Sequence, residues 1–124
     1  MSQLNVLVMN WRMILIQITK LEQLQNSINT GNPTLVYFSG ENCSVCKVLK
    51  PKIEEEVLKR FPKFKLFEVQ TDLDKEITSH FTVFSIPTTL IFFDNKEFKR
   101  VGRNMSVALF IEELKRPYNL MCEE

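Results

Sequence analysis

Two cysteines separated by two residues are the side chains of this chain best suited to chemistry. They lie in the segment Cys43-Ser44-Val45-Cys46, between an apolar run and an amphipathic stretch. At a helix N-terminus, the helix dipole and unpaired N–H groups lower the pKa of a thiol, which favours Cys43 as a nucleophile. A spacing of three residues on a helix brings the two sulfurs to one face. The pattern therefore predicts that Cys43 attacks a disulfide and that Cys46 resolves the mixed disulfide.

Two other interpretations of the cysteine pair stay open at this point. Free cysteine is often buried and inert, so the pair could simply fill the core. A zinc site needs four ligands, and the other candidates are His80 and Cys122. Because the sequence has no second C-x-x-C segment, we expect no metal. Exchange between a dithiol and a disulfide implies no tightly bound cofactor.

The composition is that of an ordinary globular domain. Hydrophobic residues make up 44% and charged residues 25% of 124 residues, enough for one domain with a hydrophobic core. Sixteen Lys and Arg against fifteen Asp and Glu give a net charge of +1, which disfavours nucleic acids and anionic membranes as partners. Three cysteines are too few for a secreted disulfide scaffold. We therefore expect a reducing compartment.

An apolar stretch at residues 6–18 raises the question of export or membrane insertion. Asn10, Arg12 and Gln17 interrupt it, and it is shorter than the roughly 20 residues needed to cross a bilayer. It also lacks a basic leader and a small-residue cleavage site. We expect a cytoplasmic protein without stable membrane insertion, whose N-terminal segment 1–12 has an order that the sequence does not determine.

Strand-like and helix-like patterns alternate around the cysteines. Apolar runs predict strands, and spacings of three and four residues predict helices. The predicted strands are 14–18, 34–38, 64–69, 88–93 and 97–101, and the predicted helices are 21–28, 46–60, 74–81 and 107–114. Successive strand–helix–strand units predict parallel pairs, and the last two strands predict an antiparallel hairpin. The sequence thus predicts an α/β fold, a central mixed sheet flanked by helices in the order βαβαββα.

Proline marks the predicted end of the last helix. Pro117 is expected to close it, because proline disrupts a helix interior. The predicted domain therefore spans residues 13–117, and residues 118–124 form a tail that contains Cys122. Most of the phenylalanines, Phe84 among them, are assigned to core packing.

These residues resemble the thioredoxin family over about residues 13–116. The segment Cys43-Ser44-Val45-Cys46-Lys47 corresponds to the family's C-G-P-C-K, and Ser85-Ile86-Pro87-Thr88 corresponds to its G-I-P-T loop. Pro51 stands at the offset of the family's helix-kinking proline. The resemblance implies the thioredoxin fold and a cis proline at Pro87 that faces the cysteines. It also implies that the Ile86 backbone pairs with an extended substrate, with Val45 and Ile86 as exposed apolar contacts.

The resemblance implies a protein-disulfide reductase. Its expected partners are disulfide-bearing proteins and an external reductase such as a thioredoxin reductase. A disulfide oxidase or isomerase, and a protein-binding module with little turnover, remain alternatives. Because Ser44-Val45 replaces the family's Gly-Pro, the redox potential cannot be carried over.

Two positions near the cysteines depart from the family. Tyr37 stands where the family has a buried aspartate, and Glu68 stands where it has the lysine that partners that aspartate. We predict that Glu68 is a partly buried carboxylate, hydrogen-bonded to Tyr37, that accepts the proton of Cys46. The alternative is a solvated glutamate at a strand end. Lys47 could lend positive charge to the thiolates, although a lysine on the first turn of an amphipathic helix is usually solvated.

Overall fold

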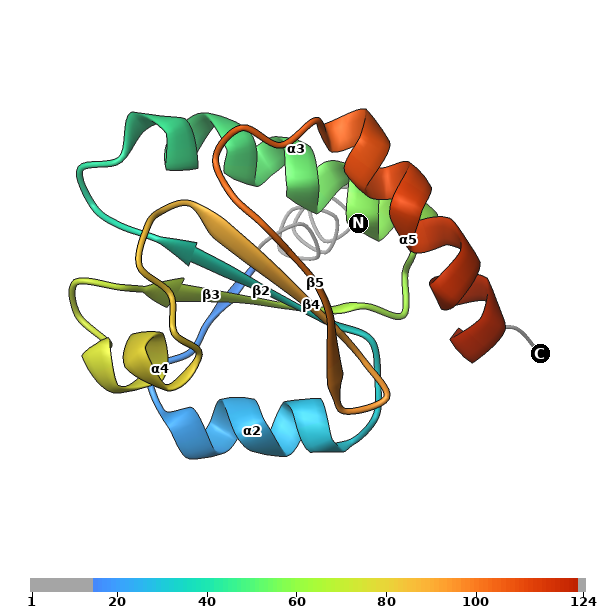
Figure 1. Ribbon diagram of the computed structural model, residues 1–124, viewed down its shortest axis with the longest axis horizontal. Coiled ribbons are helices and arrows are strands. Elements are labelled where there is room, and N and C mark those ends of the chain that lie inside the picture. The colour runs from blue at the N-terminus through green and yellow to red at the C-terminus, as the bar shows by residue number, and fades with distance from the viewer. Residues whose placement is uncertain (1–14, 123–124) are drawn as a thin grey trace, which may run out of the picture.

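The computed structural model describes residues 15–122, which form one central sheet between two helical layers (Figure 1). The strands are β1 (Ile16–Gln17), β2 (Thr34–Ser39), β3 (Lys65–Gln70), β4 (Thr88–Phe93) and β5 (Lys96–Val101), and the helices are α2 (Leu21–Asn29), α3 (Ser44–Arg60), α4 (Lys75–His80) and α5 (Val107–Cys122). The strand order across the sheet is β1-β3-β2-β4-β5. Helices α3 and α5 cover one face, and α2 and α4 cover the other. The predicted α/β fold with a mixed sheet is confirmed.

The described chain runs in the order βαβαβαββα. Each predicted strand and helix, including helix 74–81, corresponds to one of these elements, whereas the predicted order βαβαββα was short by one strand and one helix. Strand β1 has only the exposed pair Ile16–Gln17, shorter than the predicted strand 14–18. It lies at the sheet edge and pairs with β3 alone. The predicted N-terminal segment 1–12 lies outside the described residues. None of the helices in residues 15–122 is long and apolar enough to span a membrane.

Strand β2 is the central strand that the sequence predicts. It pairs in parallel with β3 and antiparallel with β4, and all six of its residues are buried. Side chains alternate between the faces of a strand. Leu35 and Tyr37 pack on the side of α3 and α5, whereas Val36 and Phe38 pack on the side of α2 and α4. The sheet therefore separates two cores, and the core that contains Tyr37 also contains both cysteines.

The hairpin of β4 and β5 is confirmed and brings the chain back toward the cysteines. Asp94 and Asn95 connect the two strands with φ angles of 54° and 69°. A two-residue hairpin turn requires this left-handed backbone, which Asp and Asn tolerate. Beyond β5, the side chain of Arg103 contacts the loop before β4 by a hydrogen bond to Ile86. The hairpin thus sets one border of the candidate site.

Helix α5 continues through Pro117, so the predicted helix end is wrong. A proline inside a helix costs about 3 kcal/mol. Tertiary packing offsets this cost, because Tyr118 is only 9% exposed. Its ring centroid lies 4.8 Å from that of Phe61 and 5.9 Å from that of Phe64. Residues 118–122 therefore form part of the helix and not a loose tail, while residues 123–124 lie outside the described chain.

Candidate active site

The two cysteines lie where the chain passes from β2 into α3. Cys43 is the N-cap residue of α3, and its Sγ accepts a hydrogen bond from the backbone N–H of Cys46 at 3.1 Å. The cysteines form a disulfide with their Cα atoms 5.3 Å apart. Cys43 is 7% exposed and Cys46 is 2% exposed. The structure thus has the first cysteine at the helix N-terminus and the second, more deeply buried, one turn inside.

The loop before β4 carries a cis peptide bond between Ile86 and Pro87. This is the isomer that the family resemblance implies. Ile86 and Val45 pack against the core cluster that contains both cysteines, so they are half-buried and not exposed as predicted. A Cβ atom at Gly40 would lie 2.7 Å from Cδ1 of Ile86. The glycine after β2 therefore lets this loop approach the segment that leads to the cysteines.

Phe84 and Leu73 are exposed near this site. Phe84 is 90% exposed, so its predicted place in the core is wrong, and Leu73 is 76% exposed. Phe84 lies two residues before Ile86 in a loop, where no neighbouring strand or helix covers it. The residues around Phe84 show neither the spacing of a helix nor the alternation of a strand. The proline loop that follows could have indicated that Phe84 lies at the surface.

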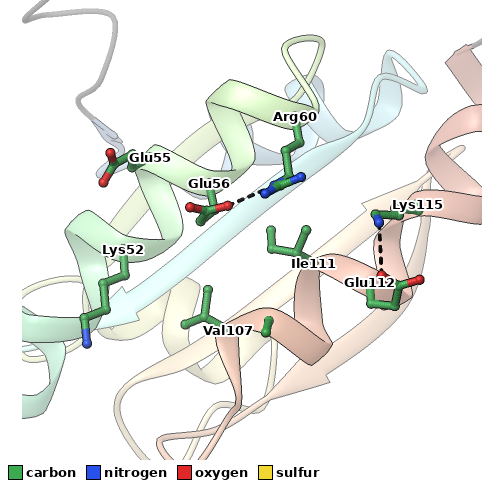
Figure 2. Close-up of a pocket in the computed structure, with 9 residues that line it drawn as sticks. Lys52, Glu55, Glu56, Arg60, Val107, Ile111, Glu112 and Lys115 are labelled. Atoms are coloured by element: carbon green, nitrogen blue, oxygen red, sulfur yellow. Dashed lines mark hydrogen bonds and ion pairs between the residues drawn. The ribbon is translucent and has the colours of Figure 1, made fainter.

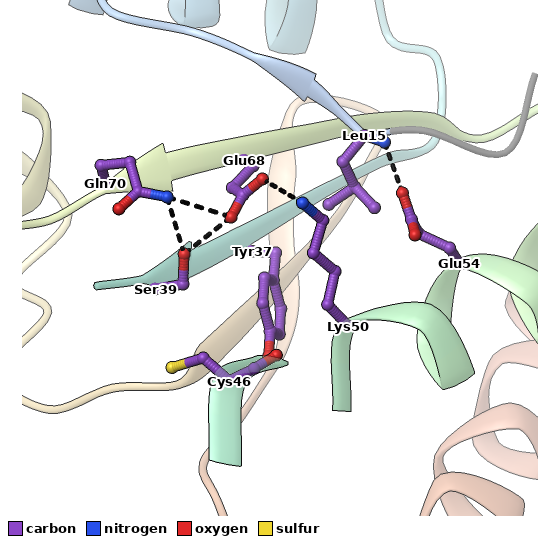
Figure 3. A network of polar contacts seen from close by, with 8 residues as sticks. All are labelled: Leu15, Tyr37, Ser39, Cys46, Lys50, Glu54, Glu68 and Gln70. Carbon is purple, nitrogen blue, oxygen red and sulfur yellow. Dashed lines mark hydrogen bonds and ion pairs between the residues drawn. The ribbon is translucent and has the colours of Figure 1, made fainter. Parts of the chain in front are cut away.

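Tyr37 lies beneath the first turn of α3 and anchors it to the sheet (Figure 3). Its hydroxyl donates a hydrogen bond to the backbone carbonyl of Cys46 at 2.8 Å. A tyrosine has one O–H donor, so the predicted hydrogen bond from Tyr37 to Glu68 is wrong. Burial, reinforced by the negative charge of Glu68, raises the pKa of the Tyr37 hydroxyl. The hydroxyl therefore stays protonated and holds the Cys46 backbone in place.

Glu68 lies at the centre of a buried polar network (Figure 3). It is 4% exposed, so it is buried and not a solvated glutamate at the strand end. Its Oε1 accepts a hydrogen bond from Nζ of Lys50 at 2.7 Å. Its Oε2 accepts from Oγ of Ser39 at 2.8 Å and from Nε2 of Gln70 at 3.2 Å. These contacts satisfy both oxygens of a carboxylate that burial alone would destabilise.

Sequence reasoning missed the three partners of Glu68. Ser39 and Gln70 are paired residues of β2 and β3, and Glu68 pairs with Tyr37 two residues earlier. This register depends on tertiary pairing and is not visible along the chain. The position of Lys50 near the cysteines could have been predicted, because Lys50 follows Cys46 by four residues on α3 and so lies on the same face of the helix.

A second buried carboxylate, Glu54, lies on α3, one turn after Lys50 (Figure 3). It is 8% exposed, and its Oε2 accepts a hydrogen bond from the backbone N–H of Leu15. Burial raises the pKa of Glu54, and the charge of Glu68 adds to the increase. The Leu15 N–H and the charge of Lys50 act in the opposite direction. Lys50 therefore compensates two buried acids and pairs directly with one of them.

A cavity of about 470 Å³ opens beside Cys46. Lys47, Lys50 and Glu68 line it together with Cys46, so the buried carboxylate and the second cysteine share one cavity. Lys47 is exposed, as expected for a lysine on the first turn of an amphipathic helix. The cavity therefore places polar side chains next to Cys46.

A groove of about 430 Å³ between α3 and α5 offers no comparable chemistry (Figure 2). Charged side chains dominate it, and several are paired: Glu56 with Arg60 at 2.9 Å and Glu112 with Lys115 at 3.0 Å. Cysteine and histidine are absent from the described residues that line it. The candidate active site is therefore the cysteine pair with its adjoining cavity.

Known proteins resemble this chain along most of its length. The Thioredoxin family model matches residues 15–116. The chain is 33% identical over 100 residues to the thioredoxin-like protein YdfQ of Bacillus subtilis (strain 168), covering 81% of this chain and 88% of YdfQ. The crystal structure of thioredoxin from Trypanosoma brucei brucei has a TM-score of 0.74 and 25% identity, covering 84% of this chain and 90% of that one. A bifunctional thioredoxin reductase/thioredoxin of Mycobacterium leprae is 25% identical over 101 residues, covering 82% of this chain and 22% of that protein.

Proposed function

The chain belongs to the thioredoxin family, and we propose that it is a thiol-disulfide oxidoreductase that reduces disulfide bonds in other proteins. The observation that supports this most directly is the disulfide between Cys43, at the N-cap of α3, and the more deeply buried Cys46. One sulfur near the surface and one behind it suit an attacking and a resolving thiol.

Reduction of a substrate proceeds from the dithiol form in two steps. The N-terminus of α3 favours the thiolate of Cys43, which attacks one sulfur of the substrate disulfide. A mixed disulfide forms, the substrate S–S bond breaks, and the first substrate thiolate leaves. Cys46 then loses its proton and attacks Sγ of Cys43, which closes the Cys43–Cys46 disulfide and releases the second thiolate. Two electrons pass to the substrate, so an external reductant must restore the dithiol.

Glu68 is the group that takes the proton of Cys46 in this scheme. Both residues line the same cavity, which is large enough for water molecules to connect them. Tyr37 fixes the backbone of Cys46, and Lys50 holds one carboxylate oxygen of Glu68. A carboxylate oriented in this way can act as a general base. Lys47, on the rim of the cavity, adds positive charge that favours the thiolates.

The substrate binds beside the sulfurs as an extended chain. The Ile86 backbone before Pro87 pairs with the substrate main chain. Val45 and Ile86 contribute half-buried apolar contacts next to the cysteines.

A thioredoxin reductase is the reductant that restores the dithiol, and the cytoplasm is the compartment in which the cycle runs. The Mycobacterium leprae relative supports the choice of reductant, because its name combines the reductase and the thioredoxin in one chain. A reducing compartment keeps cysteine pairs of this kind available as dithiols.

Glu68→Gln is expected to slow disulfide exchange about tenfold near pH 7, as the loss of roughly 1.4 kcal/mol of stabilisation in the proton-transfer step would do. The rate of exchange increases with pH, and in Glu68→Gln this increase should occur at higher pH, because Cys46 must then lose its proton without a nearby base. Stopped-flow reduction of a peptide disulfide between pH 5 and 9 measures the profile. Glu41→Gln removes the same charge from another residue of the cavity and should leave the profile unchanged. An identical profile for Glu68→Gln and wild type would exclude Glu68 as the base.

Insulin reduction in the presence of dithiothreitol tests the proposed activity. The wild-type protein should accelerate precipitation of the insulin B chain, and titration against glutathione gives the potential of the Cys43–Cys46 couple. A potential well above about −200 mV would favour an oxidase or isomerase instead. No acceleration at all would favour a protein-binding module.

A further inference from the structure

Arg103 places a positive charge beside the loop that carries the cis proline. Its Nη2 donates a hydrogen bond to the carbonyl oxygen of Ile86 at 3.3 Å, and the residue is exposed. A guanidinium group has five N–H donors in a planar fork. The contact with Ile86 uses one of them, which leaves donors at the surface next to the loop that carries the cis proline.

The charge of Arg103 is not compensated within residues 15–122, where no ion pair joins it to a carboxylate. The nearby Arg100 provides a contrast. Arg100 holds both oxygens of Glu97 at 2.7 and 2.9 Å, and it also donates to the carbonyl of Thr82 at 3.1 Å. The charge of Arg100 is therefore neutralised by Glu97 on β5, whereas the charge of Arg103 remains available for a ligand.

Two acids, Glu41 and Asp72, lie on the side of the cavity next to Cys46. Asp72 lies near the side chain of Ile86, because a Cβ atom at Gly40 would lie 2.7 Å from Cδ1 of Ile86 and 4.0 Å from Oδ1 of Asp72. Arg103 instead contacts the carbonyl oxygen of Ile86, which belongs to the main chain that pairs with a substrate. A substrate that pairs with the Ile86 backbone therefore meets Arg103.

The Ile86 carbonyl connects Arg103 to the bound substrate. A carbonyl oxygen has two lone pairs, so the Ile86 oxygen can keep Arg103 and also accept an N–H from an extended substrate chain. The guanidinium then lies within a few ångströms of the substrate backbone. A side chain next to the reacting cysteine of the substrate comes within its reach, and a carboxylate matches the geometry of the fork.

We propose that Arg103 determines substrate preference and favours disulfides with an acidic side chain next to the reacting cysteine. This inference rests on the proposed function. Arg103 acts on binding and orientation of the substrate and takes no part in the exchange of bonds between sulfur atoms. Its effect is therefore on kcat/KM for charged substrates and not on the reactivity of Cys43 itself.

Single-turnover reduction of three synthetic peptide disulfides tests the preference. The peptides differ only in the residue beside one cysteine, which is Asp, Asn or Lys. We expect wild-type protein to reduce the Asp peptide about two- to fivefold faster than the Asn peptide, as a partly exposed ion pair allows, and the Lys peptide more slowly than both. The difference should shrink at high salt, because salt screens exposed charges.

Charge variants identify the residue responsible. Arg103→Gln should make the three rates equal, and Arg103→Glu should favour the Lys peptide. Arg116→Gln removes the same charge from an exposed position on α5 and should keep the wild-type order. Equal rates for the three peptides with wild-type protein, or an unchanged order in Arg103→Glu, would overturn the inference while the proposed reductase activity stands. Failure of wild type to reduce any peptide would overturn the proposed activity and this inference together.

Discussion

Cys43→Ser is expected to reduce the insulin reduction rate to that of dithiothreitol alone, and Cys46→Ser is expected to stop the cycle one step later. A serine hydroxyl is not ionised near neutral pH and cannot replace the attacking thiolate. Without Cys46, the first step still occurs, but the mixed disulfide on Cys43 has no resolving thiol. The two variants should therefore both be inactive and yet differ in the covalent species that they accumulate.

Mass spectrometry of the protein after incubation with a peptide disulfide separates the two cases. Cys46→Ser should gain the mass of one peptide thiol, and Cys43→Ser should gain none. Cys122→Ser is the matched control, because Cys122 lies at the end of α5, and it should keep full activity. A stable adduct in Cys43→Ser, with none in Cys46→Ser, would show that the roles of the two cysteines are reversed.

Lys50→Met is expected to lower the free energy of unfolding by about 3 kcal/mol at pH 7, because it leaves the buried carboxylate of Glu68 without its cation. Lys50 is 32% exposed and Glu68 is 5% exposed in their side chains, so the uncompensated charge lies on the buried side of the pair. Lys52→Met removes an exposed lysine from the same helix and should change stability by less than about 0.5 kcal/mol. Urea denaturation followed by circular dichroism measures both.

The double variant Lys50→Met/Glu68→Gln distinguishes the charge from the packing of Lys50. A neutral amide at position 68 can still accept a hydrogen bond from Ser39, so most of the lost stability should return. If the double variant were as unstable as Lys50→Met, the buried charge would not be the cause.

The pH dependence of stability gives a further check on Lys50. A carboxyl with a raised pKa in the folded state stabilises the fold when protonated, and this contribution is lost as the pH rises. Burial raises the pKa of Glu54 above its ordinary value of 4.5, and Lys50 opposes that increase. The stability of Lys50→Met should therefore fall more steeply above pH 4.5 than that of wild type.

The sequence was sufficient for the fold and the reacting pair because local patterns encode both. The buried run that forms β2 and the cysteines at the start of α3 follow directly from residue type and spacing. The cis state at Pro87 came from the resemblance to the family, since most X–Pro bonds are trans. The predicted end of α5 at Pro117 was wrong, because the packing of Tyr118 outweighs the local effect of the proline.

The surroundings of the pair depended on contacts between distant residues. The burial of Glu68 was underestimated because a glutamate is rarely buried, and its partners Ser39 and Lys50 come from two other elements. Phe84 was assigned to the core on its residue type alone, although a loop before a proline has no partner that would cover it. Charge compensation and exposure are properties of the assembled fold, so they appear only with the structure.

Alternation along β2 has a consequence for how this protein can evolve. Val36 and Phe38 interlock with α2 and α4 on the far side of the sheet, whereas Tyr37 braces the turn that bears the sulfurs. Ile86 packs against the cores on both sides of the sheet. Amino acid replacements beneath α2 and α4 that spare the neighbours of Ile86 should therefore disturb the cysteine pair least.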